Sequence, residues 1–230
     1  MIVSMARLGP RAVRAMADRY LRAFDIADVD VLTPASAMRA AGFRLRSSSA
    51  PHLGGMTLSG ERVAYIARGG NAAARLEASR HELGHVVQFS DGVAVADQCE
   101  ASCERLGLIV CLPPVVFGEA LREAGPDVRA LRDWYLRRAD VDVAEEDLAL
   151  RVALQLGAEY ALERMKGGAL RILWSEVAND LPLDQQFRLS QLGADAWQSE
   201  EPQNGDGSLA IPYRDRSQRL RVVVVVGQAA

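Results

Sequence analysis

Residues 79–88 read SRHELGHVVQ and hold two of the chain's three histidines, four residues apart, with a glutamate directly after the first. Residues four apart lie on the same face of an α-helix, one turn from each other. His81 and His85 can therefore bind one Zn²⁺ ion together, each at about 2.0–2.1 Å. Glu82 points to the side of that pair, where it reaches a zinc-bound water without being a ligand. This arrangement is the HExxH pattern, and it predicts Glu82 as the general base.

The flanking sequence supports a helix at this position. Asn71 is a typical N-cap for a helix over 72–89, and Ser90-Asp91-Gly92 ends it. A random chain of this length contains HExxH about 1% of the time, so the helical context and the strand predicted before it strengthen the match. Gly84 is costly in a helix interior, which indicates that another element passes close to this helix.

The third ligand is expected from the following segment, because a catalytic zinc ion usually takes three protein ligands and leaves its fourth position to water. The next predicted helix, 94–111, carries the carboxylates of Asp97, Glu100 and Glu104. They recur at intervals of three and four residues, so all three lie on one face. Glu100 is the first choice for its position within the helix, followed by Glu104 and then Asp97. The others face solvent in this interpretation.

Other polar or sulfur-bearing side chains lie nearby in the sequence. His52 falls in the predicted loop 47–60, where we expect an exposed side chain unless it assists the metal site or a substrate. Cys99 and Cys103 lie four residues apart near the predicted metal face. A structural zinc site would normally use Cys-x-x-Cys spacing, so we favour packing as small buried residues for both cysteines.

Two stretches together resemble the ImmA/IrrE-type zinc metallopeptidases: RLEASRHELGH at 75–85 and EASCERLGLIVCLP at 100–113. That family follows its HExxH helix with a second helix of the form E-x-x-A-x-x-F-A-x-x-L-L-M-P. On this pattern Glu100 falls on the ligand glutamate and Pro113 on the closing proline. The other matched positions keep size or polarity, except that Leu106 replaces an aromatic residue.

The resemblance implies both a fold and an activity. The fold is α+β, with a zincin-like metallopeptidase domain over 1–167 that contains a small antiparallel sheet, the active-site helix and a glutamate-bearing helix. The activity is zinc-dependent cleavage of a peptide bond in a protein partner, often a helix-turn-helix transcriptional repressor. In that reading His81, His85 and Glu100 hold Zn²⁺, and Glu82 activates water.

The resemblance is strongest over 60–115 and ends near residue 165. Gly167-Gly168 is the best internal boundary. The segment beyond it, 168–230, is predicted to be β-rich and to serve as a partner-binding or regulatory appendage. Its expected strands are 169–174, 208–214 and 219–226.

Local patterns predict the remaining elements. Helices are expected at 11–24, 34–42, 117–124, 127–138 and 144–165. Strands are expected at 42–49 and 61–70, with the loop 47–60 between them. In zincin-like folds an edge strand pairs with extended substrate, and we assign that role to residues 62–67 or to the neighbouring strand.

Composition narrows the partners and the setting. Apolar residues make up 49% and charged residues 25% of the chain, which is ordinary for a globular protein. The net charge of −3 argues against a broadly basic nucleic-acid surface, and the arginine-rich stretch 214–221 is expected to be a solvated hairpin turn. No signal peptide or membrane span is expected. Three clustered cysteines do not suggest a disulfide framework, so we expect a cytoplasmic protein.

A second function accounts for the same ligands. A non-catalytic scaffold would bind zinc and a regulator without cleaving it. Such a scaffold has no use for a general base, so an intact Glu82 favours the enzyme.

Overall fold

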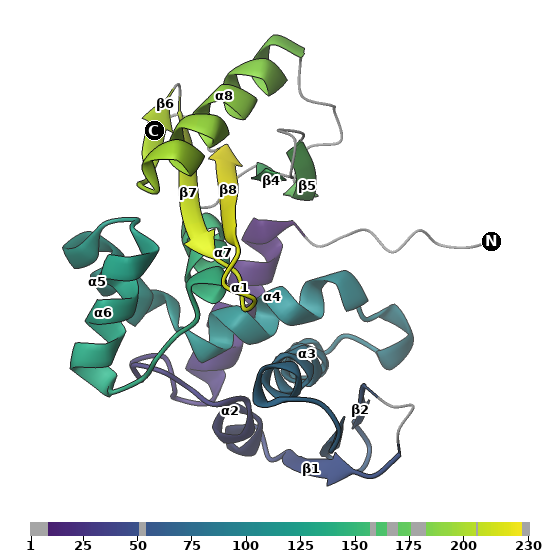
Figure 1. Ribbon diagram of the computed structural model, residues 1–230. Coiled ribbons are helices and arrows are strands. Elements are labelled where there is room, and N and C mark those ends of the chain that lie inside the picture. The colour runs from purple at the N-terminus through teal and green to yellow at the C-terminus, as the bar shows by residue number, and fades with distance from the viewer. Residues whose placement is uncertain are drawn as a thin grey trace. The chain divides into compact units, whose positions relative to one another are not determined.

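The chain folds into α-helices and two small β-sheets, and thus has an α+β fold (Figure 1). A computed structural model describes residues 9–50, 54–156, 160–164, 170–175, 183–205 and 207–226 of the 230. The chain divides into two compact units, Met1–Val116 and Phe117–Ala230. The predicted boundary at Gly167-Gly168 falls inside the second unit, because the strands before and after it pair with each other in one sheet. The two glycines themselves lie outside the described residues.

The first unit contains a three-stranded sheet and helices that pack around it. Its helices are α1 (Pro10–Ala23), α2 (Pro34–Ala40), α3 (Ala72–Ser90), the short 3₁₀ helix η1 (Val95–Asp97) and α4 (Glu100–Cys111). Its strands are β1 (Arg44–Ser48), β2 (Gly55–Leu58) and β3 (Val63–Ala67). These elements confirm the predicted helices at 11–24, 34–42 and 72–89 and both predicted strands.

The sheet differs from the prediction in its pairing. β3 is the central strand, and it runs parallel to β1 and antiparallel to β2. The sheet is therefore mixed, not antiparallel. The cause is β2, which lies in the segment predicted as the loop 47–60 and forms a hairpin with β3, so that β1 must pair with the opposite edge. Because β3 is paired on both sides, residues 62–67 have no free edge for a substrate, whereas β2 is at the edge.

The helix that carries the two histidines begins as the sequence predicts. The side chain of Asn71 accepts a hydrogen bond from the backbone N–H of Ala74 at 2.8 Å, which satisfies one of the open donors of the first turn. α3 then packs against β2, β3 and α4. Its buried face includes Leu83, Val86 and Val87, all fully buried.

α3 and α4 approach each other at the level of their backbones, through two glycines. A Cβ atom added to Gly84 of α3 would lie 2.2 Å from the carbonyl oxygen of Cys103 in α4. A Cβ atom added to Gly107 of α4 would lie 2.1 Å from the carbonyl oxygen of Arg80 in α3. Only residues without a side chain fit at both positions, which confirms that another element passes close to Gly84.

The helix predicted over 94–111 is interrupted. Val95–Asp97 forms the short 3₁₀ helix η1, and α4 begins only at Glu100. Between them Gln98 and Cys99 are extended, because side chains of α3 hold them: Gln88 accepts the backbone N–H of Cys99 at 2.6 Å. Asp97 therefore does not share a helix face with Glu100 and Glu104.

The second unit consists of helices packed on a five-stranded antiparallel sheet. Its helices are α5 (Pro114–Ala124), which begins just before the boundary, α6 (Val128–Ala139), α7 (Glu145–Gln155) and α8 (Leu183–Ser199). Its strands, in the sheet order β5-β4-β8-β7-β6, are β4 (Tyr160–Arg164), β5 (Leu170–Ser175), β6 (Gln203–Gly205), β7 (Ser208–Arg214) and β8 (Leu220–Val226).

Two predictions for this unit are wrong in part. The helix expected over 144–165 ends at Gln155, and Tyr160–Arg164 pairs with β5 and β8 as a strand. The segment 168–230 has the expected strands but also contains the 17-residue helix α8. Leu189 and Ala196 of α8 are buried against the sheet, so its hydrophobic burial stabilises a helix that local pattern alone did not reveal.

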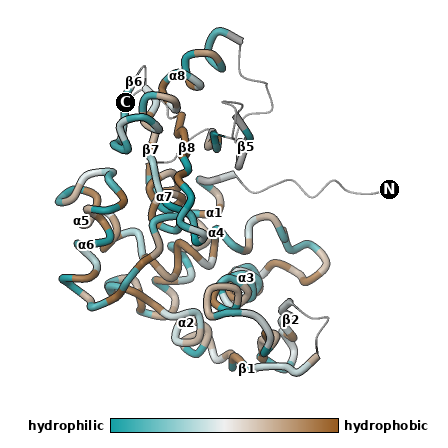
Figure 2. The backbone as a smooth tube through the Cα atoms, viewed as in Figure 1, coloured by the Kyte–Doolittle hydropathy of each residue, from teal (hydrophilic) through white to brown (hydrophobic). Residues whose placement is uncertain are grey.

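The valine run of β8 forms the centre of this core. Val222, Val224 and Val226 belong to the cluster beneath α8, and the alternating Val223 and Val225 point to the opposite face, which α7 contacts. All five valines are buried, and β8 is correspondingly apolar along this half (Figure 2). Helices on both faces explain why the run is continuously apolar rather than alternating.

The arginine-rich stretch 214–221 forms the turn between β7 and β8, as predicted. The N–H of Asp215 donates to the carbonyl oxygen of Arg219 at 2.9 Å, and the Asp215 carboxylate accepts a bond from Arg221 at 3.1 Å. Arg214, Arg216 and Arg221 thus have carboxylate partners within the unit, which fits a hairpin turn. Among the described residues no single helix has the length and apolarity needed to cross a membrane, and only α4 and α5 counted together meet that test, across the bend between them.

Replacing Gly84 by alanine should destabilise the first unit, because the added methyl group would overlap backbone atoms of α4. We expect the free energy of unfolding of this unit to fall by about 3 kcal/mol, measured by hydrogen exchange of the α3 and α4 amides. Gly118→Ala in α5 of the second unit is the control, measured by exchange of the α5 amides, since its methyl group would lie 3.5 Å from the nearest atom, an ordinary contact. It should be neutral or stabilising by up to about 1 kcal/mol. Equal losses in both variants would contradict the role of Gly84.

Candidate metal centre

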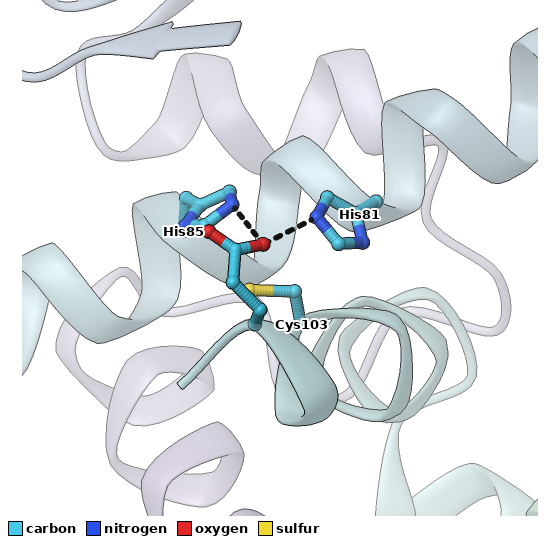
Figure 3. A group of neighbouring side chains, drawn as sticks. His81, His85 and Cys103 are labelled. Carbon is cyan, nitrogen blue, oxygen red and sulfur yellow. Dashed lines mark hydrogen bonds and ion pairs between the residues drawn. The ribbon is translucent and has the colours of Figure 1, made fainter. Parts of the chain in front are cut away.

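Three of the residues selected from the sequence converge where α3 passes the start of α4. The Nε2 atoms of His81 and His85 lie 3.1 Å and 3.3 Å from the same carboxylate oxygen, Oε2 of Glu100 (Figure 3). The two imidazoles come from successive turns of α3, with ring centres 5.1 Å apart. Glu100 is the first residue of α4, and its carboxylate reaches back to both rings.

These separations fit a divalent metal ion with nitrogen and oxygen ligands. Ligand atoms at about 2.0–2.1 Å from a tetrahedral zinc ion lie about 3.3 Å from one another. The two measured separations between histidine nitrogen and glutamate oxygen, 3.1 Å and 3.3 Å, are of this size. Two imidazoles and one carboxylate also form a donor set that zinc prefers. His81, His85 and Glu100 can thus hold one ion at a common point.

Gln98 fixes the orientation of the His85 ring through Nδ1, the ring nitrogen that does not face Glu100. This Nδ1 atom lies 2.7 Å from Oε1 of Gln98, and the amide nitrogen of Gln98 donates to the backbone carbonyl of His85 at 3.3 Å. An imidazole that donates from Nδ1 carries its lone pair on Nε2. Gln98 therefore selects the tautomer in which Nε2, the atom facing Glu100, is free to bind a metal.

Glu82 lies beside the three ligand candidates, but its carboxylate is hydrogen-bonded to a residue of β2. Its carboxylate accepts a hydrogen bond at 2.7 Å from the hydroxyl of Thr57 in β2, and only 3% of the residue is exposed. Gly55 of the same strand makes room for it, because a Cβ atom there would lie 2.2 Å from Oε1 of Glu82. The strand thus holds the carboxylate in a defined place against α3.

The surroundings of Glu82 shift its acidity. Burial raises the pKa of the Glu82 carboxyl above its usual value, while the hydrogen bond from Thr57 and the nearby imidazoles oppose the rise. A carboxylate with a raised pKa is a stronger base than an exposed one. Its position and its basicity therefore suit proton transfer.

A surface pocket of about 380 Å³ opens beside these side chains. Its lining includes His81 and Glu82 from α3, Gly54 and Gly55 next to them, and Glu104 from α4. The pocket therefore brings an external molecule within reach of the first histidine and of the buried carboxylate. Glu104 lies at its wall.

Cys103 is a fourth potential ligand in this group. Among the described residues, ligand atoms of His81, His85, Glu100 and Cys103 all lie within 4.8 Å of one another. The Cys103 thiol is fully buried and accepts a hydrogen bond from the side-chain amide of Gln88 at 3.1 Å. Burial, together with the nearby carboxylates, raises the pKa of this thiol well above its usual range. The predicted burial of Cys103 and its predicted place near the metal face are both confirmed, and its preference for packing over metal binding stays a prediction.

The remaining predicted candidates stand apart from the group. Asp97 lies in η1, and Glu104 contributes to the pocket wall, so neither joins the donor atoms around the imidazoles. Cys99 is buried near them but outside the group, and its sulfur accepts a bond from the hydroxyl of Ser102 at 3.2 Å. His52 lies outside the described residues.

Two contacts of the site were not anticipated from the sequence, those made by Thr57 and by Gln98. Thr57 lies in a segment rich in glycine and serine that gave no strand signal, and Gln98 lies where a helix was expected. Nothing in the local sequence marks either residue as a partner of α3. Both become neighbours of the histidine helix only through the folded arrangement.

The comparisons with known proteins add information about the fold alone. No protein-family model matches the sequence, and no curated protein matches it. A solved structure described as a Mycobacterium tuberculosis transcriptional regulator is similar, with a TM-score of 0.53 and 13% sequence identity. The similarity covers 93% of this chain and 88% of that one. At this identity the similarity concerns the course of the chain and not its chemistry.

Replacing Gln98 by alanine should weaken metal binding, because His85 would lose the acceptor that fixes its ring. We expect zinc affinity to fall about 10–100-fold, measured by competition with a chromophoric chelator. Gln98→Glu is the matched variant, since a carboxylate keeps the acceptor opposite Nδ1 and should retain affinity close to that of the wild type. If both variants bound zinc as the wild type does, the orienting role of Gln98 would be refuted.

Proposed function

We propose that this protein is a zinc-dependent endopeptidase that cleaves a peptide bond in a protein partner. The observation that carries the proposal is the convergence of His81 and His85 on one oxygen of Glu100, with the buried carboxylate of Glu82 beside them. A zinc ion bound by these ligands lowers the pKa of a water ligand and polarises a carbonyl group. The proton transfers are carried out by side chains of the protein.

Glu82 is the general base in this proposal. Its carboxylate takes the proton of the attacking water and passes it to the nitrogen of the departing amine. The hydrogen bond from Thr57 at 2.7 Å keeps the carboxylate pointed in one direction and leaves its second oxygen for the proton transfer.

β2 provides a place for the substrate. Among the described strands it pairs with β3 alone, so its other edge is open to an extended peptide. Gly55 and Thr57 alternate with Met56 along β2, and both face Glu82. A peptide added to this edge would therefore run past the base and the pocket next to it.

The choice of partner comes from the family resemblance. An ImmA/IrrE-type enzyme acts on a protein substrate, and a helix-turn-helix repressor in the cytoplasm is our specific proposal. The competing proposal is a non-catalytic scaffold that binds zinc and a regulator. The buried and hydrogen-bonded Glu82 favours the enzyme, because burying a carboxylate is energetically unfavourable and a scaffold needs no general base at this position.

Two single substitutions separate the roles of base and ligand. Glu82→Gln should lower cleavage of a fluorogenic peptide library about 10²–10⁴-fold and leave one zinc bound per chain. Glu100→Ala should lower both zinc affinity and cleavage, since it removes a ligand. Zinc content is measured by elemental analysis of the purified chain. Full cleavage by Glu82→Gln would disprove the mechanism. A wild-type chain that binds zinc but cleaves no peptide would favour the scaffold.

A pair of adjacent glycines tests the position of the base. Gly55→Ala places a methyl group 2.2 Å from Oε1 of Glu82, so the flexible carboxylate must move while the backbone stays. We expect cleavage to fall about 10–100-fold, with zinc content unchanged. Gly54→Ala is the control, because a methyl group there meets no atom within 4 Å. Equal rates for Gly55→Ala and Gly54→Ala would show that Glu82 does not need its present position.

A further inference from the structure

The thiol of Cys103 lies close to the three proposed zinc ligands. Cys103 belongs to α4 and is not among the residues that line the pocket. Its Sγ atom lies within 4.8 Å of ligand atoms of His81, His85 and Glu100 (Figure 3). We propose that Cys103 is a fourth protein ligand that closes the metal centre in a resting form. This inference rests on the proposed zinc-binding function.

Packing confines the thiol to this space. Cys103 has no exposed surface, and its backbone lies against Gly84, which directly precedes His85 on α3. Two hydrogen bonds define its present position, one accepted from Gln88 at 3.1 Å and one donated to the carbonyl of Cys99 at 3.6 Å. These two hydrogen bonds thus hold the sulfur next to the proposed ligand atoms.

A short movement converts this position into a ligand position. The sulfur and nitrogen ligands of a tetrahedral zinc ion lie about 3.6 Å apart. Because Sγ already lies within 4.8 Å of the other ligand atoms, it would have to approach by no more than roughly 1 Å. Rotation of a single side-chain bond supplies such a shift, and it replaces the hydrogen bond from Gln88 by the bond to the metal. The two positions of one sulfur atom thus define two forms of the site.

The two forms differ in their chemistry. With Cys103 bound, zinc has four protein ligands, the closed coordination typical of structural sites, and no position remains for water. With Cys103 held by Gln88, the fourth position is open, as in catalytic sites. Closure requires the thiol to lose its proton to the solvent as the sulfur–metal bond forms. Opening takes a proton back, and neither step involves an oxidant or a reductant.

Cys99 provides a matched control within the same segment. It is also buried, and it lies four residues before Cys103, but its sulfur accepts a bond from Ser102 and is outside the ligand group. Substitution of either cysteine by serine changes volume little. A difference between the two variants therefore reports on metal coordination and not on loss of a buried thiol in general.

Cobalt substitution tests the inference directly. The metal-free full chain is titrated with Co²⁺, whose visible bands report tetrahedral binding and whose near-ultraviolet charge-transfer band reports a sulfur ligand. We expect both signals in the wild type and in Cys99→Ser, and loss of the charge-transfer band in Cys103→Ser. Cadmium NMR of the wild type repeats the test for a sulfur ligand without any substitution.

The outcomes separate this inference from the function beneath it. Tetrahedral Co²⁺ without a charge-transfer band in the wild type would overturn the role of Cys103 and leave the zinc site intact. A band that persists in Cys103→Ser would also overturn it. No binding of Co²⁺ at all would refute the proposed metal centre as well. Zinc affinity, measured by chelator competition, should fall about tenfold or more in Cys103→Ala and stay unchanged in Cys99→Ala.

Discussion

The backbone contact between α3 and α4 is the constraint on which the candidate site depends. At Gly84 and Gly107 a backbone carbonyl oxygen of the other helix occupies the space that a Cβ atom would need. Any residue with a Cβ atom at either position would hold the helices further apart. Glu100, at the start of α4, would then no longer reach the two imidazoles. Two small residues thus set the distances between the proposed ligands: Gly84, which directly precedes His85 in α3, and Gly107, which follows Glu100 by two helical turns in α4.

A second contact, between β2 and α3, gives the site its base. A buried carboxylate is unfavourable unless it is hydrogen-bonded, and the strand supplies both the space at Gly55 and the donor at Thr57. The same strand is at the edge of its sheet, so the residues that position Glu82 also border the place proposed for an extended substrate. The hydrogen bond from Thr57 to Glu82 thus connects the edge strand proposed to bind substrate with the proposed base.

Much of the site could be predicted from the sequence because it depends on helical periodicity. The cap at Asn71, the spacing of the histidines and the need for a small residue at Gly84 are local properties, and each agrees with the structure. The contacts of Thr57 and Gln98 could not be predicted, because they join residues far apart in the sequence: Thr57 contacts Glu82, 25 positions away, and Gln98 contacts His85, 13 positions away. The helix α8 was missed for a similar reason: its apolar residues gain their stability from the sheet they cover.

The electrostatics of the group argue for a cation between its members. The Nδ1 atom of His85 is committed to Gln98, so in the neutral ring a lone pair on Nε2 faces an oxygen of Glu100 at 3.3 Å. Two electron-rich atoms at this distance repel unless positive charge lies between them. His81 can carry its proton on Nε2 and donate it to the carboxylate, so the His85 contact is the one that needs a positive charge. A metal ion would supply that charge while contacting both imidazoles and the carboxylate from one point, and the convergence of the two rings on one oxygen is compatible with such an ion.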